Sequence, residues 1–165
     1  MTFFNEIKKN PGLLPKLVIF IYRFGNFTYF HVHIPIIRQI LYLIYRLFDL
    51  IFLKLFLNCD IPGSTKIGPG FRIFHPYGIV INTASVIGKD FLIRGETTIG
   101  NKGTSDDCPV IGDNVEVGMG ARIIGGITIA SKTKIGANAV VTKSCQPNSV
   151  LVGIPAHNIQ RKREK

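Results

Sequence analysis

The sequence has no tryptophan, two methionines and three cysteines, and only 18% of its 165 residues are charged. Cys59, Cys108 and Cys145 are odd in number and lack CxxC spacing, so they indicate neither a disulfide framework nor a zinc site, and we expect a reducing compartment. Beside 46% hydrophobic residues, so little charge indicates that part of the surface is covered, either by other subunits or by a membrane.

Acidic residues are also scarce: ten Asp and Glu stand against twenty Lys and Arg, which gives a net charge of +10. Such a balance favours an anionic partner, whether nucleic acid, an acidic membrane surface or a phosphorylated small molecule. The basic end, residues 161–165, is too short and too irregular to indicate nucleic-acid binding, so we expect no nucleic-acid partner. Residues 1–6 lack the basic start and the cleavage site of a signal peptide, and we expect a cytoplasmic protein.

Long uncharged runs are missing as well. Residues 34–57 are rich in Leu, Ile, Phe and Tyr, but charged residues divide them into runs far shorter than the roughly 20 residues that a membrane-spanning helix needs. Residues 24–37 carry no charge other than histidines, yet Gly25, Asn26 and Pro35 are expected to interrupt them. We therefore expect no transmembrane helix.

Residues 34–57 instead have the pattern of one amphipathic helix. Their charged residues are Arg38, Arg46, Asp49 and Lys54. At 100° per residue, three of these four fall within about 120° of one another, which leaves a broad apolar face. Pro35 suits the first helical turn, and Asn58 suits the position where the helix ends. We expect residues 1–58 to form an N-terminal helical, apolar segment.

From residue 61 onward an aliphatic residue recurs every six positions, with one slip of two residues and one skipped member. The series is Ile61, Ile67, Ile73, Ile79, Ile81, Ile87, Ile93, Ile99, Ile111, Val117, Ile123, Ile129, Ile135 and Val141. Neither the 3.6-residue period of a helix nor the two-residue alternation of a strand produces it. It predicts a solenoid in which each hexapeptide supplies one short strand and one turn, with the aliphatic side chain in a narrow core.

This pattern resembles the hexapeptide-repeat family, in which three hexapeptides complete one triangular coil. The resemblance implies a mainly β fold, a left-handed parallel β-helix, here over residues 59–156, and assembly as a homotrimer. We expect residues 157–165 to form a basic C-terminal tail. Two alternatives stay open for the helix of residues 34–57: its apolar face packs on the β-helix, or it rests on the inner face of a membrane as a peripheral contact.

Several segments are similar to serine acetyltransferases. They are Asp60-Ile61-Pro62, Lys66-Ile67-Gly68-Pro69-Gly70, His75-Pro76-Tyr77-Gly78-Ile79-Val80, Val110-Ile111-Gly112 and Val152-Gly153-Ile154-Pro155-Ala156. In that family the His of the H-x-x-G segment is the general base, and an Asp fifteen residues earlier orients it, which implies these roles for His75 and Asp60. A hydroxyl must lose its proton as it attacks a thioester, and imidazole has a pKa suited to take it. His31, His33 and His157 have no such context.

The skipped member of the series leaves a polar, glycine-rich stretch, and we expect a protruding loop over residues 100–110 because the twelve-residue gap keeps the phase. In serine acetyltransferases a loop here reaches toward a neighbouring subunit and ends in Arg-His-Pro, whose basic residues hold the amino acid. This chain has Asp107-Cys108-Pro109 instead, and Phe74 replaces the acidic residue that precedes the catalytic His. A bound serine needs a cation for its carboxylate and an anion for its ammonium, so both departures argue against serine.

The predicted acceptor-binding residues are Phe74, Tyr77, Asn101, Asp107 and Cys108. They would offer an apolar or aromatic wall beside the catalytic His and polar groups from the loop. A nucleophilic role for Cys108 is disfavoured, because Asp106 and Asp107 would raise the pKa of its thiol.

The resemblance also implies acetyl-coenzyme A as a co-substrate, bound in the groove between neighbouring β-helices, and no metal. The candidate positions are Gly100, Met119, Gly120, Lys134, Ala137, Ala139 and Lys143. Small residues would let the pantetheine approach the backbone, and the two lysines would meet phosphates.

We therefore interpret the chain as an O-acetyltransferase that uses His75 and Asp60 to acetylate a hydroxyl. The expected acceptor is a small-molecule or lipid-linked saccharide of capsular or exopolysaccharide biosynthesis. Two alternatives stay open. Serine O-acetylation for cysteine synthesis is disfavoured by the loop and by Phe74, and a non-catalytic β-helix scaffold is disfavoured by the His75 and Asp60 pair.

Overall fold

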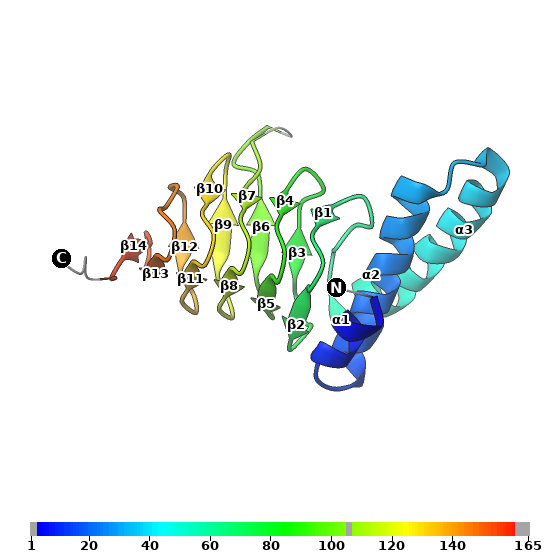
Figure 1. The fold of residues 1–165 in the computed structure, drawn as a ribbon, viewed down its shortest axis with the longest axis horizontal. Coiled ribbons are helices and arrows are strands. Elements are labelled where there is room, and N and C mark those ends of the chain that lie inside the picture. Colours follow the sequence, from blue (N-terminus) through cyan, green and yellow to red (C-terminus); the bar gives the residue numbers. More distant parts are fainter. Residues whose placement is uncertain (1–2, 105–106, 161–165) are drawn as a thin grey trace.

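The computed structural model describes residues 3–104 and 107–160. It consists of helices followed by a β-solenoid, and Figure 1 shows the helices at one end of the solenoid and the C-terminus at the other. The helices are α1 (Phe3–Lys9), α2 (Leu13–His31), α3 (Pro35–Phe48) and a π-helical continuation of α3, η1 (Asp49–Phe56). Asp106 and residues 161–165 of the expected tail lie outside the described residues.

Short strands in the described part of the solenoid form three sheets. Sheet A contains β3 (Val80–Ile81), β6 (Thr98–Gly100), β9 (Arg122–Ile124) and β12 (Val140–Val141). Sheet B contains β1 (Lys66–Ile67), β4 (Val86–Ile87), β7 (Val110–Ile111) and β10 (Thr128–Ile129). Sheet C contains β2 (Arg72–Phe74), β5 (Leu92–Arg94), β8 (Glu116–Val117), β11 (Lys134–Ile135), β13 (Val150–Val152) and β14 (His157–Asn158). Because successive strands belong to different sheets in turn, the chain winds as a triangular coil.

The strand pairs are parallel except for β13 with β14, which is antiparallel. The residues 157 and 158, expected to begin the tail, therefore form the last strand of sheet C instead. Each coil is stacked in register on the next, as in sheet B, where Ile67 pairs with Ile87 and Ile87 with Ile111. The six-residue series thus becomes three columns of aliphatic side chains.

These aliphatic columns form the core of the solenoid. Every member of the series is buried, with exposed fractions of 6% or less. Small or β-branched residues fill the corners between sheets, among them Ala121 and Thr133, which are fully buried. Turn glycines let adjacent coils touch through their backbones, because a Cβ on Gly68 would lie 2.7 Å from the carbonyl carbon of Gly88. The predicted hexapeptide solenoid is confirmed.

The helical segment differs from the prediction in one respect. The helix α2 runs through Gly25 and Asn26, so the expectation that these residues interrupt it is wrong. Gly25 is required by packing rather than by a break, because a Cβ there would lie 2.4 Å from the ring of Tyr45 on α3. Asn26 directs its side-chain amide to the carbonyls of Gly63 at 2.8 Å and Thr65 at 3.0 Å.

The predicted helix of residues 34–57 is present as α3 and η1. Pro35 occupies the start of α3, as expected. After η1, Asn58 adopts the left-handed conformation with φ of 50°, which ends the helix as predicted. Across the described residues, none of the helices combines the length and the apolar character that a membrane span requires.

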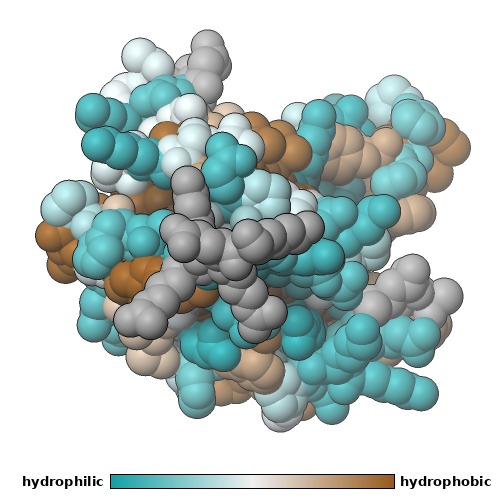
Figure 2. All heavy atoms as spheres, turned by 60° about the vertical axis from the view of Figure 1, so that its left-hand side comes forward, coloured by the Kyte–Doolittle hydropathy of each residue, from teal (hydrophilic) through white to brown (hydrophobic). Residues whose placement is uncertain are grey.

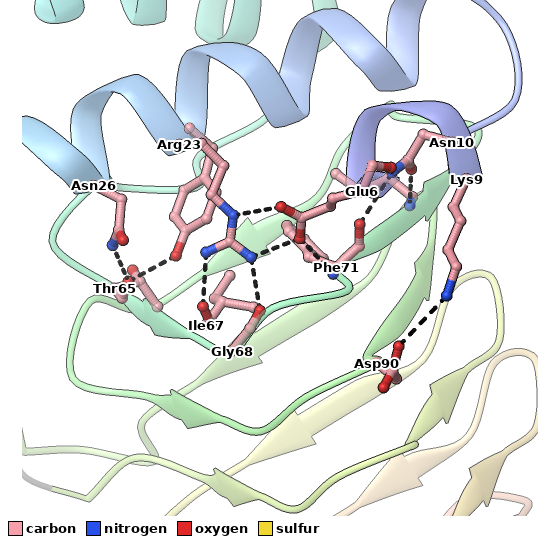
Figure 3. A network of polar contacts seen from close by, with 12 residues as sticks. Glu6, Lys9, Asn10, Arg23, Asn26, Thr65, Ile67, Gly68, Phe71 and Asp90 are labelled. Carbon is pink, nitrogen blue, oxygen red and sulfur yellow. Dashed lines mark hydrogen bonds and ion pairs between the residues drawn. The ribbon is translucent and has the colours of Figure 1, made fainter. Parts of the chain in front are cut away.

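Polar side chains of α1 and of Asn10, which follows it, close the open edge of the first coil (Figure 3). Glu6 accepts the Phe71 N–H at 2.6 Å. Asn10 accepts the Ile73 N–H at 2.7 Å and donates to the Phe71 carbonyl at 3.0 Å. A β-ladder edge otherwise leaves such backbone groups without partners.

Arg23 of α2 completes this closure. Its guanidinium binds both oxygens of Glu6, at 2.6 and 2.8 Å, and donates to the carbonyls of Ile67 and Gly68 at 2.8 and 2.7 Å. Tyr22 adds a hydrogen bond from its hydroxyl to the Thr65 carbonyl at 2.9 Å. The Glu6 side chain is almost fully buried, so each charge depends on the other.

We expect Arg23→Met to lower the free energy of unfolding by about 3–5 kcal/mol, because it leaves the buried Glu6 carboxylate and two carbonyls unpaired. The matched control is Lys9→Met, which removes the half-exposed ion pair with Asp90 at 4.0 Å and should cost no more than about 1 kcal/mol. Urea unfolding of the two variants measures both values. Equal, small losses would contradict a closing role for Arg23.

Candidate active site

His75 lies on the corner where the chain passes from sheet C to sheet A. Its φ is 55°, and its side chain is exposed. The corner is longer than its equivalent in the next coil: the flanking core residues Ile73 and Ile81 are eight positions apart, whereas Ile93 and Ile99 are six positions apart. The two-residue slip of the repeat is therefore the extra length of the corner that carries His75.

Asp60 lies on the neighbouring coil beside this corner. Its backbone N–H donates to the Ile79 carbonyl at 2.7 Å, and its carboxylate pairs with Nζ of Lys54 at 3.2 Å. Within the described chain, no hydrogen bond joins Asp60 to His75. The Lys54 and Asp60 side chains are 42% and 48% exposed, so their pairing contributes at most about 1 kcal/mol, and a change of partner costs little.

Lys54 also links Asp60 to a buried acid. Its Nζ lies 3.7 Å from Asp49 Oδ2, while Asp49 Oδ1 is buried without a hydrogen-bond partner. Burial raises the pKa of the Asp49 carboxyl, against the opposing effect of Lys54. The sequence pattern predicted only that Asp49 and Lys54 are charged residues of one helix. Nothing in the sequence around them predicts their contact with Asp60.

A cleft of about 440 Å³ opens beside His75. The corner lines it with Phe74 and Tyr77, and residues 11–15, the end of the α1–α2 turn with the start of α2, form the facing wall. The structure therefore brings the two predicted aromatic residues together with His75. Residues 11–15 were not predicted as part of the site, because their contact with residue 75 is not visible in any local pattern.

Arg94 is a second residue that the sequence reasoning missed. Sheet C pairs Phe74 with Arg94, and the guanidinium carbon lies 5.7 Å from the centre of the Phe74 ring. Arginine over an aromatic face is a favourable cation–π arrangement. The repeat could have predicted this contact, because residues at equivalent positions of adjacent coils pair on the same sheet.

The corner that holds His75 is the first of a stacked column of corners. The hydrogen bonds that stack them are Glu96 N–H to Tyr77 O at 2.6 Å, Gly120 N–H to Gly95 O at 3.0 Å and Asn138 N–H to Met119 O at 2.8 Å. Met119 and Ala137 are exposed on this column. Three of the predicted coenzyme positions, Met119, Gly120 and Ala137, thus lie in line with His75.

The other predicted coenzyme positions lie elsewhere. Ala139 is fully buried in the core and offers no surface to a ligand, which corrects its assignment; small residues at that repeat position fill the corner instead. Lys134 points outward from β11 on sheet C. Gly100 ends β6, and Lys143 follows β12, so both lie on the corner between sheets A and B.

The predicted loop of residues 100–110 also leaves from the corner between sheets A and B. Asn101 donates to the Thr104 carbonyl at 2.9 Å, and a carboxylate oxygen of Asp107 accepts the Gly126 N–H. Cys108 is buried, with 7% of its surface exposed. One chain therefore holds His75 and the loop at opposite corners of sheet A, and it does not bring Asn101, Asp107 or Cys108 to His75.

Comparison with known proteins adds to this geometry. Residues 108–143 match the family model for the bacterial transferase hexapeptide (six repeats). The proposed colanic acid biosynthesis acetyltransferase WcaB of Escherichia coli K12 is 41% identical to this chain over 99 residues. The match covers 59% of this chain and 61% of that protein. A serine acetyltransferase of Mycobacterium tuberculosis is 36% identical over 110 residues, covering 66% of this chain and 48% of that protein.

Solved structures of serine acetyltransferases have the same fold. The Brucella abortus enzyme in complex with coenzyme A gives a TM-score of 0.75 at 27% identity, covering 89% of this chain and 56% of that one. The Entamoeba histolytica isoform 3 in complex with cysteine gives 0.69 at 30% identity, covering 93% and 52%. The chain thus spans about half to three-fifths of the length of these relatives. The hexapeptide series continues on both sides of the matched segment and folds into a triangular coil, so the solenoid of this chain is similar to that of hexapeptide-repeat transferases.

Proposed function

We propose that the chain is a cytoplasmic O-acetyltransferase that moves an acetyl group from acetyl-coenzyme A to a sugar hydroxyl in capsular or exopolysaccharide biosynthesis. The observation that carries the proposal is the exposed His75 on a lengthened corner, at the head of the column that holds Met119 and Ala137. The relatives named above, which are acetyltransferases, and a solved neighbour that holds coenzyme A support this reading.

His75 acts as the general base in the proposed reaction. The acceptor hydroxyl attacks the carbonyl carbon of the acetyl thioester while the imidazole takes the hydroxyl proton. As the carbon–sulfur bond breaks, the thiolate leaves, and the imidazolium returns the proton to it. No enzyme nucleophile is needed, which agrees with the burial of Cys108.

Asp60 supports the imidazolium in this proposal. A carboxylate that accepts from the second ring nitrogen fixes the tautomer and stabilises the charge that develops. The exposed pair of Asp60 with Lys54 is weak enough for Asp60 to turn from Lys54 to His75.

The column of corners suits the donor. A pantetheine chain is extended and needs close approach to backbone groups, and Gly120 and Ala137 present little side chain there. In this proposal Met119, Gly120 and Ala137 contact the coenzyme. Lys134, Gly100 and Lys143 lie away from this column, and a role for them requires a neighbouring subunit.

The groups near His75 favour a sugar over serine as the acceptor. Serine would require a cation from the loop, but the loop offers Asp107, whose carboxylate already accepts the Gly126 N–H. Phe74 stands where an acid would hold the ammonium, and its ring faces Arg94. A sugar needs neither fixed charge, and an aromatic wall of Phe74 and Tyr77 suits the face of a pyranose ring.

A homotrimer is part of the proposal. His75 and the loop lie at opposite corners of sheet A, so a complete acceptor site needs the loop of one subunit beside His75 of the next. Light scattering at micromolar concentration should give three times the chain mass of 18.3 kDa. A monomer that acetylates its acceptor would contradict the shared site.

His75→Ala should lower kcat about 10²–10⁴-fold, the usual contribution of a positioned base, with the secondary structure unchanged. Asp60→Asn should lower it less, because Asp60 orients and stabilises rather than transfers a proton. His157→Ala is the matched control, since His157 lies in β14 at the far end of sheet C, and it should keep wild-type turnover. Thiol release from acetyl-coenzyme A with a saccharide acceptor measures all three, and normal turnover by His75→Ala would refute the assignment.

With acetyl-coenzyme A, L-serine should give thiol release little above background hydrolysis, whereas a saccharide or sugar-phospholipid should be acetylated under the same conditions. The physical reason is that a desolvated carboxylate or ammonium without a partner costs a few kcal/mol per contact, hence orders of magnitude in specificity. Product mass measured by mass spectrometry identifies the acetylated acceptor. Saturable turnover of serine that His75→Ala abolishes would instead establish a serine acetyltransferase.

A further inference from the structure

The helix α3 leaves most of its aliphatic side chains exposed. Its inner side, packed on α2, carries Tyr45 and continues into Asp49 of η1, which are 2% and 4% exposed. A helix of a soluble domain normally turns its apolar side inward and its polar side to water. Here Tyr45 and Asp49 take the inner positions, and most aliphatic side chains of α3 are left exposed beside Arg38 and Arg46.

The apolar side of this helix forms one continuous surface, called here the outer face. It consists of Ile36, Ile40, Leu43, Leu47 and Leu50, which are 49–71% exposed. At 100° per residue these five fall within about 80°, on the side opposite to Tyr45. The charged residues of α3 itself, Arg38 and Arg46, lie outside that arc. A contiguous exposed apolar surface of this kind marks an interaction site.

Positive charge borders the outer face. Arg46 and Lys54 line one hollow together with Leu43, Leu47 and Leu50. The acids of the described helical segment, Glu6 and Asp49, are both buried and paired with cations. The helical end of the molecule therefore presents apolar and cationic groups to its surroundings and no exposed carboxylate from described residues 3–57.

The rest of the molecule differs. Most exposed large hydrophobic side chains of the described chain lie in the helical segment. Figure 2 shows the C-terminal end of the solenoid, where hydrophilic side chains cover much of the surface and hydrophobic ones are scattered among them. The outer face is thus a feature of one end of the protein.

We propose that the outer face of α3 docks on an anionic lipid bilayer, with the helix lying in the plane of the interface. Apolar side chains enter the boundary between head groups and acyl chains, and the bordering cations meet lipid phosphates. A second copy of the chain fits less well, because two outer faces in contact would bring Arg46 of one copy near Arg46 of the other, and described residues 3–57 expose no acid to pair them. The absence of a spanning helix in the described residues agrees with a contact in the plane of the surface.

Docking at this end would hold the catalytic corner close to the bilayer. His75 lies on the first corner between sheets C and A, next to the turn between α1 and α2. If the proposed acetyl transfer is correct, on which this step rests, the acceptor is a saccharide carried on a membrane lipid. Such an acceptor is confined to the surface that the outer face binds.

Flotation of the full-length protein with lipid vesicles tests the docking without relying on catalysis. The probes are vesicles of phosphatidylcholine alone and vesicles with about 30% phosphatidylglycerol. We expect the wild type to bind the anionic vesicles at least about tenfold better than the neutral ones, and the preference to shrink at high salt. Absence of binding to anionic vesicles, or equal binding to both kinds, would overturn the proposal.

Two double variants locate the contact. Leu43→Glu with Leu47→Glu alters the outer face, and Ile154→Glu with Ile159→Glu makes the same change of charge at exposed positions near the other end of the solenoid. The first should lose vesicle binding about tenfold or more, and the second should bind like the wild type. If the first binds normally, or if its only change is a smaller assembly by light scattering, the outer face contacts protein instead and the proposal fails. Thiol release with a water-soluble saccharide should stay normal in both, which separates this result from a failure of the His75 assignment.

Discussion

The ion pair between Glu6 and Arg23, with the backbone groups of Phe71, Ile67 and Gly68 that it binds, sets the position of everything at the N-terminal end of the molecule. A solenoid that begins at a coil exposes a ladder edge, which invites pairing with other chains. Here the helices close that edge with charge-assisted hydrogen bonds, which are strong and directional. Solenoid proteins require such capping at their ends because each coil is stabilised by its neighbours.

The helices that close this edge also border the corner that carries His75. Residues 11–15 lie opposite Phe74 and His75, and η1 places Lys54 beside Asp60. The solenoid contributes rigidity, because each corner is hydrogen-bonded to the next. A reactive side chain on a rigid, repetitive element is held more precisely than one on a free loop.

Packing on α2 also explains why the outer face of α3 stays free. The contact is made through Gly25 and Tyr45, whose hydroxyl accepts the Gly63 N–H at 2.8 Å. Because this polar, aromatic side of α3 is used for folding, the aliphatic side is not needed for the core. Part of the apolar content of the chain therefore lies on the exposed surface of the helical segment rather than in the core.

The sequence by itself determined the solenoid, because the six-residue period is a local property that is repeated in each hexapeptide. The resemblance of the H-x-x-G segment to serine acetyltransferases singled out His75, and the pattern of residues 34–58 placed the helix ends at Pro35 and Asn58. The structure then showed that the slip between Ile79 and Ile81 is the lengthened corner that carries His75. Only the tertiary structure decided that α2 continues through Gly25, that Ala139 is buried, and that Lys54 pairs with Asp60. These three features depend on contacts between elements that are distant in the sequence, and a sequence period does not specify such contacts. They could therefore be known only from the packing of the elements in the structure.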